Sequence, residues 1–241
     1  MSHEPGERPF TSAMQAARDA GRLPLIAEVK VRSPKEGELL AGRDPVALAQ
    51  TMVAAGAACL SVVTEGPHFG GSLGLLERVA AASAVPVLCK DFVTEPRQVW
   101  ERWERGAACL LLMVSQLEWP RLQALHAEAH RAGLETLVEV HDEDELRLAL
   151  TLDLDLDLLG INNRDIRQLE CDAGTVANTL RLLGRVPPGV RTISESAIST
   201  PDEARQVIAS GGSGVLVGTA ILKAADTAAA VRHLVQAWGE A

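Results

Sequence analysis

The chain has 241 residues, of which 47% are hydrophobic, and it carries a formal net charge of −9. This length allows two small domains or one large α/β domain, and the acidic balance argues against a nucleic-acid-binding surface. No apolar stretch reaches the roughly 18 residues of a membrane span, and the amino terminus is polar. We therefore predict a cytoplasmic protein without nucleic-acid or membrane partners. A small anionic ligand is compatible with this charge, because a few local cations outweigh a distant acidic surface.

Short apolar runs alternate with amphipathic segments of helical spacing along the whole chain. The apolar runs cover residues 25–30, 58–63, 85–89, 108–114, 136–140, 158–161, 190–194 and 214–217. The amphipathic segments cover residues 44–55, 73–82, 96–105, 119–132, 143–150, 175–183, 201–210 and 227–238. Successive runs begin 22 to 33 residues apart, which is about the length of one βα unit.

An internal repeat supports this division into units. Residues 55–60 and 105–110 both contain the sequence Gly-Ala-Ala-Cys-Leu after a predicted helix, and their separation of fifty residues fits two βα units. Eight units without a break in composition favour the α/β class and a single-domain (β/α)8 TIM barrel over residues 25–241. An open doubly wound sheet is the alternative. Residues 1–24 are predicted to form an N-terminal extension, with a short helix at Thr11–Ala20 over the bottom of the barrel.

Two patterns that resemble metal sites have simpler explanations. Cys59, Cys89 and Cys109 lie within apolar runs, and none of the four cysteines belongs to a CxxC pair, so buried free thiols are predicted. The acids of residues 152–158 alternate with leucine, which places three carboxylates on one strand face without a second type of ligand. We predict a solvated strand entrance there and no metal site.

Charged and polar residues follow the predicted strands at their carboxyl ends, where (β/α)8 barrels build their active sites. They include Glu28, Lys30, Lys90, Glu139, Asn162, Arg164 and Glu195. Charges inside barrel strands are costly unless they are paired, so we interpret this set of residues as a shared functional site. The structural alternative is a buried ion-pair network that fixes the register of the strands. The lysines stand out because the chain has only four of them among 23 basic residues, and a lysine pKa can be lowered enough for proton transfer.

Small residues follow the last two strands. Loops after the seventh and eighth strands of such barrels often bind phosphate through backbone amides and hydroxyl groups. Ser196 and Ala197 occupy the first of these loops, and Gly218 and Thr219 the second. We therefore expect a phosphate group at this side of the barrel.

Five segments together resemble indole-3-glycerol phosphate synthases. They are residues 26–34, 85–92, 137–141, 160–165 and 193–198, and the segments 61–65 and 69–72 fit as well. The resemblance extends from residue 25 to about residue 222. It implies an enzyme of tryptophan biosynthesis that cyclises 1-(2-carboxyphenylamino)-1-deoxyribulose 5-phosphate with loss of carbon dioxide and water. It also implies that no metal or organic cofactor is needed, and it allows association with other enzymes of that pathway.

The resemblance assigns roles to individual residues. Lys90 resembles the general acid that protonates the ketone oxygen of the substrate, and Glu139 the general base of the later dehydration. Lys30 resembles the lysine that meets the substrate carboxylate, with Glu28 beside it. The residues that resemble substrate ligands are Asn162, Arg164 and Glu195 for polar groups, Phe69 and Phe92 for the aromatic ring, and Ser33, Ser196, Ala197, Gly218 and Thr219 for phosphate.

Three departures from the family pattern leave room for a paralogue that acts on a modified anthranilate. Ala197 stands where the family usually has glycine, the first loop reads Ser33-Pro-Lys-Glu-Gly37 instead of Ser-Pro-Ser-Lys-Gly, and the N-terminal extension is short. Two other functions remain as alternatives. A phosphoribosyl isomerase-type barrel of tryptophan or histidine synthesis would not need both Lys30 and Lys90. A catalytically silent barrel that serves as a binding subunit would have no reason to keep buried lysines.

Overall fold

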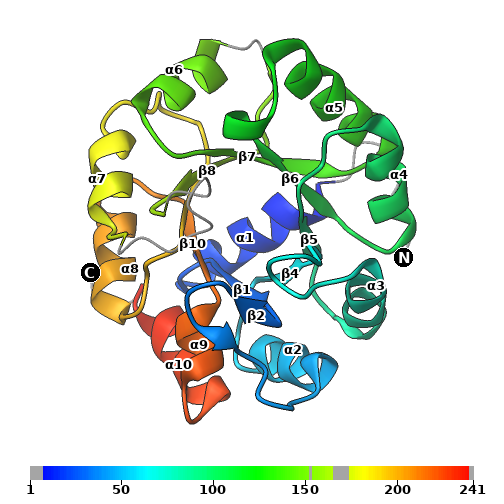
Figure 1. Cartoon of the computed structure of the whole chain (residues 1–241). Helices are drawn as coiled ribbons and strands as arrows, with labels where there is room; N and C mark the ends of the chain where they lie inside the picture. Colours follow the sequence, from blue (N-terminus) through cyan, green and yellow to red (C-terminus); the bar gives the residue numbers. More distant parts are fainter. Residues whose placement is uncertain (1–7, 152–153, 165–173, 239–241) are drawn as a thin grey trace.

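The computed structural model describes residues 8–151, 154–164 and 174–238. Parallel strands close into a barrel in the order β1-β10-β9-β8-β7-β6-β5-β4, and helices surround this ring (Figure 1). The predicted (β/α)8 barrel is therefore confirmed, and the open-sheet alternative is wrong. None of the helices in the described part of the chain combines the length and the apolar composition that crossing a bilayer requires.

Each barrel strand begins and ends within two residues of its predicted run. The strands are β1 (Leu25–Val29), β4 (Cys59–Val63), β5 (Val87–Lys90), β6 (Cys109–Met113), β7 (Glu135–Val140), β8 (Leu158–Asn162), β9 (Thr192–Glu195) and β10 (Gly214–Val217). Nearly all of their residues are buried, because helices cover the outer face and side chains fill the interior.

The outer helices also coincide with the predicted segments. They are α2 (Pro45–Ala54), α3 (Leu73–Ala82), α4 (Pro96–Glu104), α5 (Trp119–Ala132), α6 (Glu143–Thr151), α7 (Ala177–Leu183), α8 (Pro201–Ala209) and α10 (Thr227–Gln236). Their first residues carry local start signals. The Asp44 carboxylate accepts hydrogen bonds from two amides of α2, and Thr200 and Glu203 form a capping box at α8.

Four short elements were not predicted. They are the hairpin β2 (Arg32–Ser33) and β3 (Gly37–Glu38), the 3₁₀ turn η1 (Val114–Gln116) and the helix α9 (Thr219–Lys223). Each is too short to show a hydrophobic period, so the sequence gives no pattern from which to infer it. The hairpin and α9 both lie at the carboxyl ends of strands, and they shape the site described below.

A helix that precedes the barrel closes its bottom. Helix α1 (Pro9–Asp19) lies across the middle of the strand ring (Figure 1). The Glu135 carboxylate at the start of β7 accepts hydrogen bonds from the Phe10 amide at 2.6 Å and from the Thr11 amide at 3.0 Å. A Cβ atom on Gly214 would lie 2.7 Å from the Pro24 carbonyl oxygen, so β10 needs glycine there. The division of the chain into an extension and a barrel at residue 24 stays a prediction.

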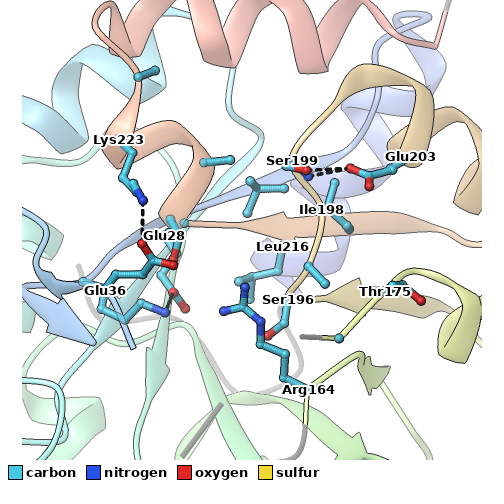
Figure 2. A pocket seen from close by; sticks show the side chains of 18 of the residues that line it. Glu28, Glu36, Arg164, Thr175, Ser196, Ile198, Ser199, Glu203, Leu216 and Lys223 are labelled. Atoms are coloured by element: carbon cyan, nitrogen blue, oxygen red, sulfur yellow. Dashed lines mark hydrogen bonds and ion pairs between the residues drawn. The ribbon is translucent and has the colours of Figure 1, made fainter. Parts of the chain in front are cut away.

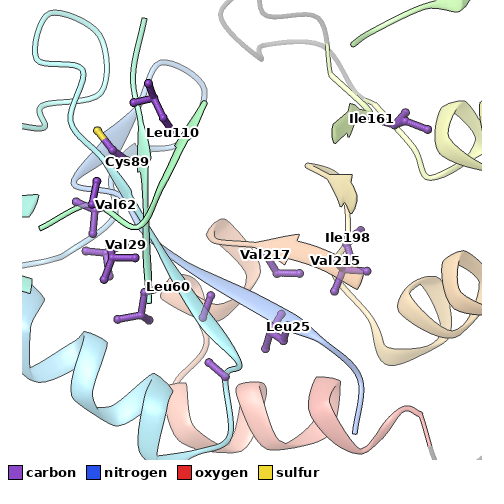
Figure 3. Packing of buried hydrophobic residues seen from close by; sticks show 14 of the residues in the cluster. Leu25, Val29, Leu60, Val62, Cys89, Leu110, Ile161, Ile198, Val215 and Val217 are labelled. Atoms are coloured by element: carbon purple, nitrogen blue, oxygen red, sulfur yellow. The ribbon is translucent and has the colours of Figure 1, made fainter. Parts of the chain in front are cut away.

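The hydrophobic core has two layers. One layer lies between the strands and the outer helices and includes Val29, Leu60 and Val217 (Figure 3). The other fills the lower barrel interior with side chains such as Ile26 and Leu88, packed against α1. Since side chains alternate across a strand, Ile26 in β1 is followed on the same face by Glu28. The interior therefore changes from apolar at the bottom to charged at the top.

The cysteines behave as predicted where they can be seen. Cys59, Cys89 and Cys109 are buried free thiols, and burial raises the pKa of each, to about 12 for Cys89. Cys171 lies outside the described residues. The prediction for residues 152–158 is wrong at Asp157, whose carboxylate is buried and lies 2.7 Å from His130 Nε2 and 2.9 Å from the Thr136 amide. An amide and an imidazole at the barrel bottom need an acceptor there, and Asp157 supplies it.

Candidate active site

Charged side chains from four strands meet at the ammonium group of Lys90, the last residue of β5. Lys90 Nζ lies 2.8 Å from Glu195 Oε2, and 3.8 Å from both Glu28 Oε2 and Glu139 Oε2. The Lys90 side chain is only 12% exposed, and the three carboxylates are almost fully buried. Residues far apart in the chain thus surround one cation in a region largely screened from water, where electrostatic interactions are strong.

Glu28 joins the two lysines of the site. Its Oε1 atom lies 3.0 Å from Lys30 Nζ, while its other oxygen faces Lys90. A Cβ atom on residue 218 would lie 2.7 Å from Glu28 Oε1, so a residue larger than Gly218 would displace the carboxylate from its place beside Lys30. Lys30 Nζ also lies 5.8 Å from the centre of the Phe69 ring, within the range of a cation–π contact.

Glu195 is the partner closest to Lys90. Burial raises the pKa of the Glu195 carboxyl group to about 8, with the Lys90 ammonium opposing this rise and the Glu139 carboxylate adding to it. A Cβ atom on Gly160 of β8 would overlap Glu195 Oε1, so a larger residue there would displace this carboxylate. The 2.8 Å hydrogen bond from Lys90 Nζ to Glu195 Oε2 holds the ammonium group in one position.

Glu139 is held from the other side by Asn162 and by His141, for which the sequence predicted no role. Its Oε1 atom lies 3.3 Å from His141 Nε2, and its Oε2 atom accepts a hydrogen bond of 3.2 Å from Asn162 Nδ2. Glu145 Oε2 in turn lies 3.0 Å from His141 Nδ1 and accepts the His141 amide at 2.8 Å. The spacing of four residues between His141 and Glu145, at the start of a helix, is the signal that could have revealed this pair.

His141 is expected to make the stability of the protein depend on pH. Burial lowers the pKa of this imidazole, but hydrogen bonds to Glu139 and Glu145 outweigh burial and raise the pKa to about 10. The folded state therefore binds a proton that the unfolded state loses above about pH 6.5. The stabilising contribution is complete below that pH and is lost as the pH rises towards 10.

The test is a comparison of His141→Gln with the unsubstituted protein by urea unfolding at pH 6 and pH 9. The loss of unfolding free energy should be larger at pH 6, with a dependence of at most about 1.4 kcal/mol per pH unit. Glu145→Gln removes one of the two carboxylates and should give a smaller difference of the same sign. Equal losses at both pH values would contradict the prediction.

An apolar pocket and a polar cavity open on opposite sides of this charged centre. The pocket is lined by Phe69, Phe92, Leu111 and Met113, together with polar residues of the centre. The cavity has a volume of about 550 Å³, and its lining includes Arg164, Ser196, Ala197, Gly218, Thr219 and Lys223 (Figure 2). Glu28, Lys30 and Lys90 line both spaces. The two spaces therefore adjoin across the lysines, one with an apolar lining and the other with a polar lining.

The structure brings together all but one of the residues singled out from the sequence. Ser33 does not line the cavity. Its hydroxyl oxygen accepts a hydrogen bond of 3.0 Å from the Glu36 amide and so supports the β2–β3 hairpin. Arg164 is placed through its amide, which donates to Asn162 Oδ1 at 3.0 Å.

Comparison with known proteins fits this geometry. A model of the family described as indole-3-glycerol phosphate synthase matches residues 1–234. A protein of that name from Chromobacterium violaceum is 40% identical over 227 residues, which cover 94% of this chain and 84% of that protein. Another, from Parafrankia sp., is 44% identical over 218 residues, which cover 90% of this chain and 80% of that protein.

The chain belongs to the indole-3-glycerol phosphate synthase family. The resemblance seen in the sequence is thus confirmed, and the comparisons give no support to an isomerase-type barrel or to a catalytically silent one. Because the family model spans nearly the whole chain, the charged centre and both adjoining spaces lie within the matched region.

Ala197, a departure from the usual family pattern, has a backbone conformation that favours glycine. Its φ is +55°, and the φ of the preceding Ser196 is +62°. An alanine in this left-handed region costs about 1–2 kcal/mol. Glycine avoids this cost, but it loses more conformational entropy on folding, which offsets part of the gain. Ala197→Gly should therefore raise the unfolding free energy by up to about 1 kcal/mol and tighten substrate binding, since the adjacent amides then adjust without strain.

Urea unfolding and KM measure these two effects. Ala220→Gly is the matched control, because Ala220 lines the same cavity but lies in helix α9. Glycine in a helix is destabilising by roughly 0.5–1 kcal/mol, so the control should change stability in the opposite direction. A loss of stability in Ala197→Gly equal to that of the control would show that the left-handed backbone carries no strain.

Proposed function

We propose that this chain is an indole-3-glycerol phosphate synthase, a carboxy-lyase that converts 1-(2-carboxyphenylamino)-1-deoxyribulose 5-phosphate to indole-3-glycerol phosphate, carbon dioxide and water. The observation that carries the proposal is the position of Lys90. Its ammonium group lies between an aromatic pocket and a cavity with phosphate-binding character, and it is surrounded by three carboxylates. This arrangement suits a substrate that has an aromatic ring at one end and a phosphate at the other.

In the proposed ring closure, the aromatic carbon that bears the carboxylate attacks the ketone carbon. Lys90 donates a proton to the ketone oxygen, which becomes a hydroxyl group, and Glu195 at 2.8 Å orients the ammonium group. Lys30, held by Glu28 at 3.0 Å, binds the carboxylate. The bond to that carboxylate then breaks, carbon dioxide leaves, and its electron pair restores the aromatic ring.

In the proposed dehydration, the Lys30 ammonium group gives a proton to the new hydroxyl group, which leaves as water, and Glu139 accepts the proton released from the neighbouring carbon. The contacts of Glu139 with His141 and Asn162 fix its carboxylate towards the site. Phe69 and Phe92 would hold the ring, and Asn162 and Arg164 the polar groups of the substrate. Glu195 lines neither space, so it would act on the substrate through Lys90. Ser196, Ala197, Gly218 and Thr219 line the cavity in which we place the phosphate. That no metal or organic cofactor takes part stays a prediction.

We also propose a cytoplasmic location. The buried free thiols Cys59, Cys89 and Cys109 support it, because reduced cysteines are typical of that compartment. Association with other enzymes of the pathway follows from the family resemblance alone. Co-purification from the native host would test it.

An ultraviolet assay for indole formation tests the proposed activity, with the plain substrate and with ring-substituted versions. Growth of indole absorbance with the plain substrate would support primary tryptophan synthesis, and turnover of a substituted substrate alone would support a specialised paralogue. A thermal shift with the reduced substrate analogue, measured in parallel, separates binding from catalysis. Binding without turnover of any version would overturn the proposal in favour of a binding subunit.

A further inference from the structure

An ion pair crosses one side of the cavity in which we place the phosphate. Glu36, in the β2–β3 hairpin, and Lys223, at the end of α9, both line this cavity. Glu36 Oε2 lies 2.5 Å from Lys223 Nζ. Figure 2 shows these side chains facing each other, with Ser196 and Arg164 on the other side of the cavity. Lys223 is thus a cation at the cavity wall, and it forms an ion pair with the carboxylate of Glu36.

The charges around Glu36 keep this carboxylate ionised. Its hydrogen bond to Lys223 lowers the pKa of Glu36 against the opposing effect of burial, and Lys35 and Arg164 add to the lowering. An ionised carboxylate at the cavity wall repels a phosphate dianion, whereas Lys223 attracts it. Phosphate and Glu36 therefore compete for the same ammonium group.

The backbone on both sides of the pair is anchored independently of it. The Glu36 amide donates to Ser33 Oγ, and the Leu39 amide donates to the Val31 carbonyl at 2.8 Å. Arg43 Nη2 donates to the Leu222 carbonyl at 2.5 Å and so fixes the end of α9 next to Lys223. Exchange of partners thus needs movement of two side-chain ends only. The Lys223 side chain is 58% exposed, and such exposed ion pairs are weak, so a dianion can replace the carboxylate.

We propose that Lys223 is a phosphate-binding residue of this site and that Glu36 is an internal competitor that weakens phosphate binding. Glu36 is the acid by which the first loop departs from the family pattern. This departure then sets the affinity for the phosphate end of the substrate. This inference rests on the proposed function only for the identity of the substrate, because the phosphate group can be tested alone.

The experiment measures the dissociation constant of inorganic phosphate by calorimetry at low salt. Glu36→Gln should tighten binding by about two- to fivefold, which corresponds to the strength of an exposed ion pair. Lys223→Met should weaken it by about tenfold, as for loss of a charged hydrogen bond. In Lys223→Met protein, the further change Glu36→Gln should have less than half of its effect, since no ammonium group remains to compete for. KM of the phosphorylated substrate should move in the same directions.

Glu38→Gln is the matched control, because Glu38 belongs to the same hairpin but does not line the cavity. It removes one negative charge as Glu36→Gln does, and it should leave phosphate binding unchanged. Three results would overturn the inference. Glu38→Gln could change the dissociation constant of phosphate as much as Glu36→Gln does, or Glu36→Gln could leave it unchanged. The effect of Glu36→Gln could also be undiminished in the Lys223→Met protein. If the phosphate dissociation constants change as expected but the protein shows no turnover, the proposed function is wrong and this inference still holds.

Discussion

Lys90→Ala is expected to abolish turnover, with a loss of more than about 10²-fold, which is the lower range for removal of a general acid. The Lys90 ammonium group contacts Glu28, Glu139 and Glu195 together. Its removal takes away the proposed proton donor to the ketone oxygen. The measurement is kcat from the rate of indole formation, with circular dichroism to verify that the barrel remains folded.

Lys90→Arg separates the acid role from the charge. Guanidinium keeps a positive charge among the carboxylates, but it holds its proton too strongly to act as a good acid. Turnover of Lys90→Arg should be lost almost as completely as that of Lys90→Ala. Its unfolding free energy should decrease less than that of Lys90→Ala. Retention of more than a few per cent of kcat in either variant would mean that another group is the acid.

The second large effect concerns Glu139→Gln. Glutamine keeps the shape and the hydrogen bond with Asn162, but it cannot accept a proton, so a loss of roughly 10²–10⁴-fold in kcat is expected for a general base. The ion pair with His141 is lost as well, and Glu145→Gln controls for this because it weakens the hold on His141 without touching Glu139. The base role would be wrong if Glu139→Gln raised KM and kept its kcat.

The sequence by itself determined the order and the limits of the main elements. Apolar runs such as residues 214–217 became strands because a barrel strand is buried on both faces, and capped amphipathic segments became helices such as α8. Alternation along a strand also places Glu28 and Lys30 on the same side of β1, since successive side chains point to opposite faces. These are properties of neighbouring residues, so one sequence is enough to reveal them.

Only the tertiary structure decided which distant groups meet. Closure of the barrel brings Glu195 to 2.8 Å from Lys90 across 105 positions of the chain, and it makes Glu28 a link between two lysines. It also buries Asp157, which local alternation had placed in solvent. The pairing of Glu36 with Lys223 depends on a hairpin and a helix too short for any periodic signal. Such contacts depend on the register and closure of strands far apart in sequence, which no local pattern encodes.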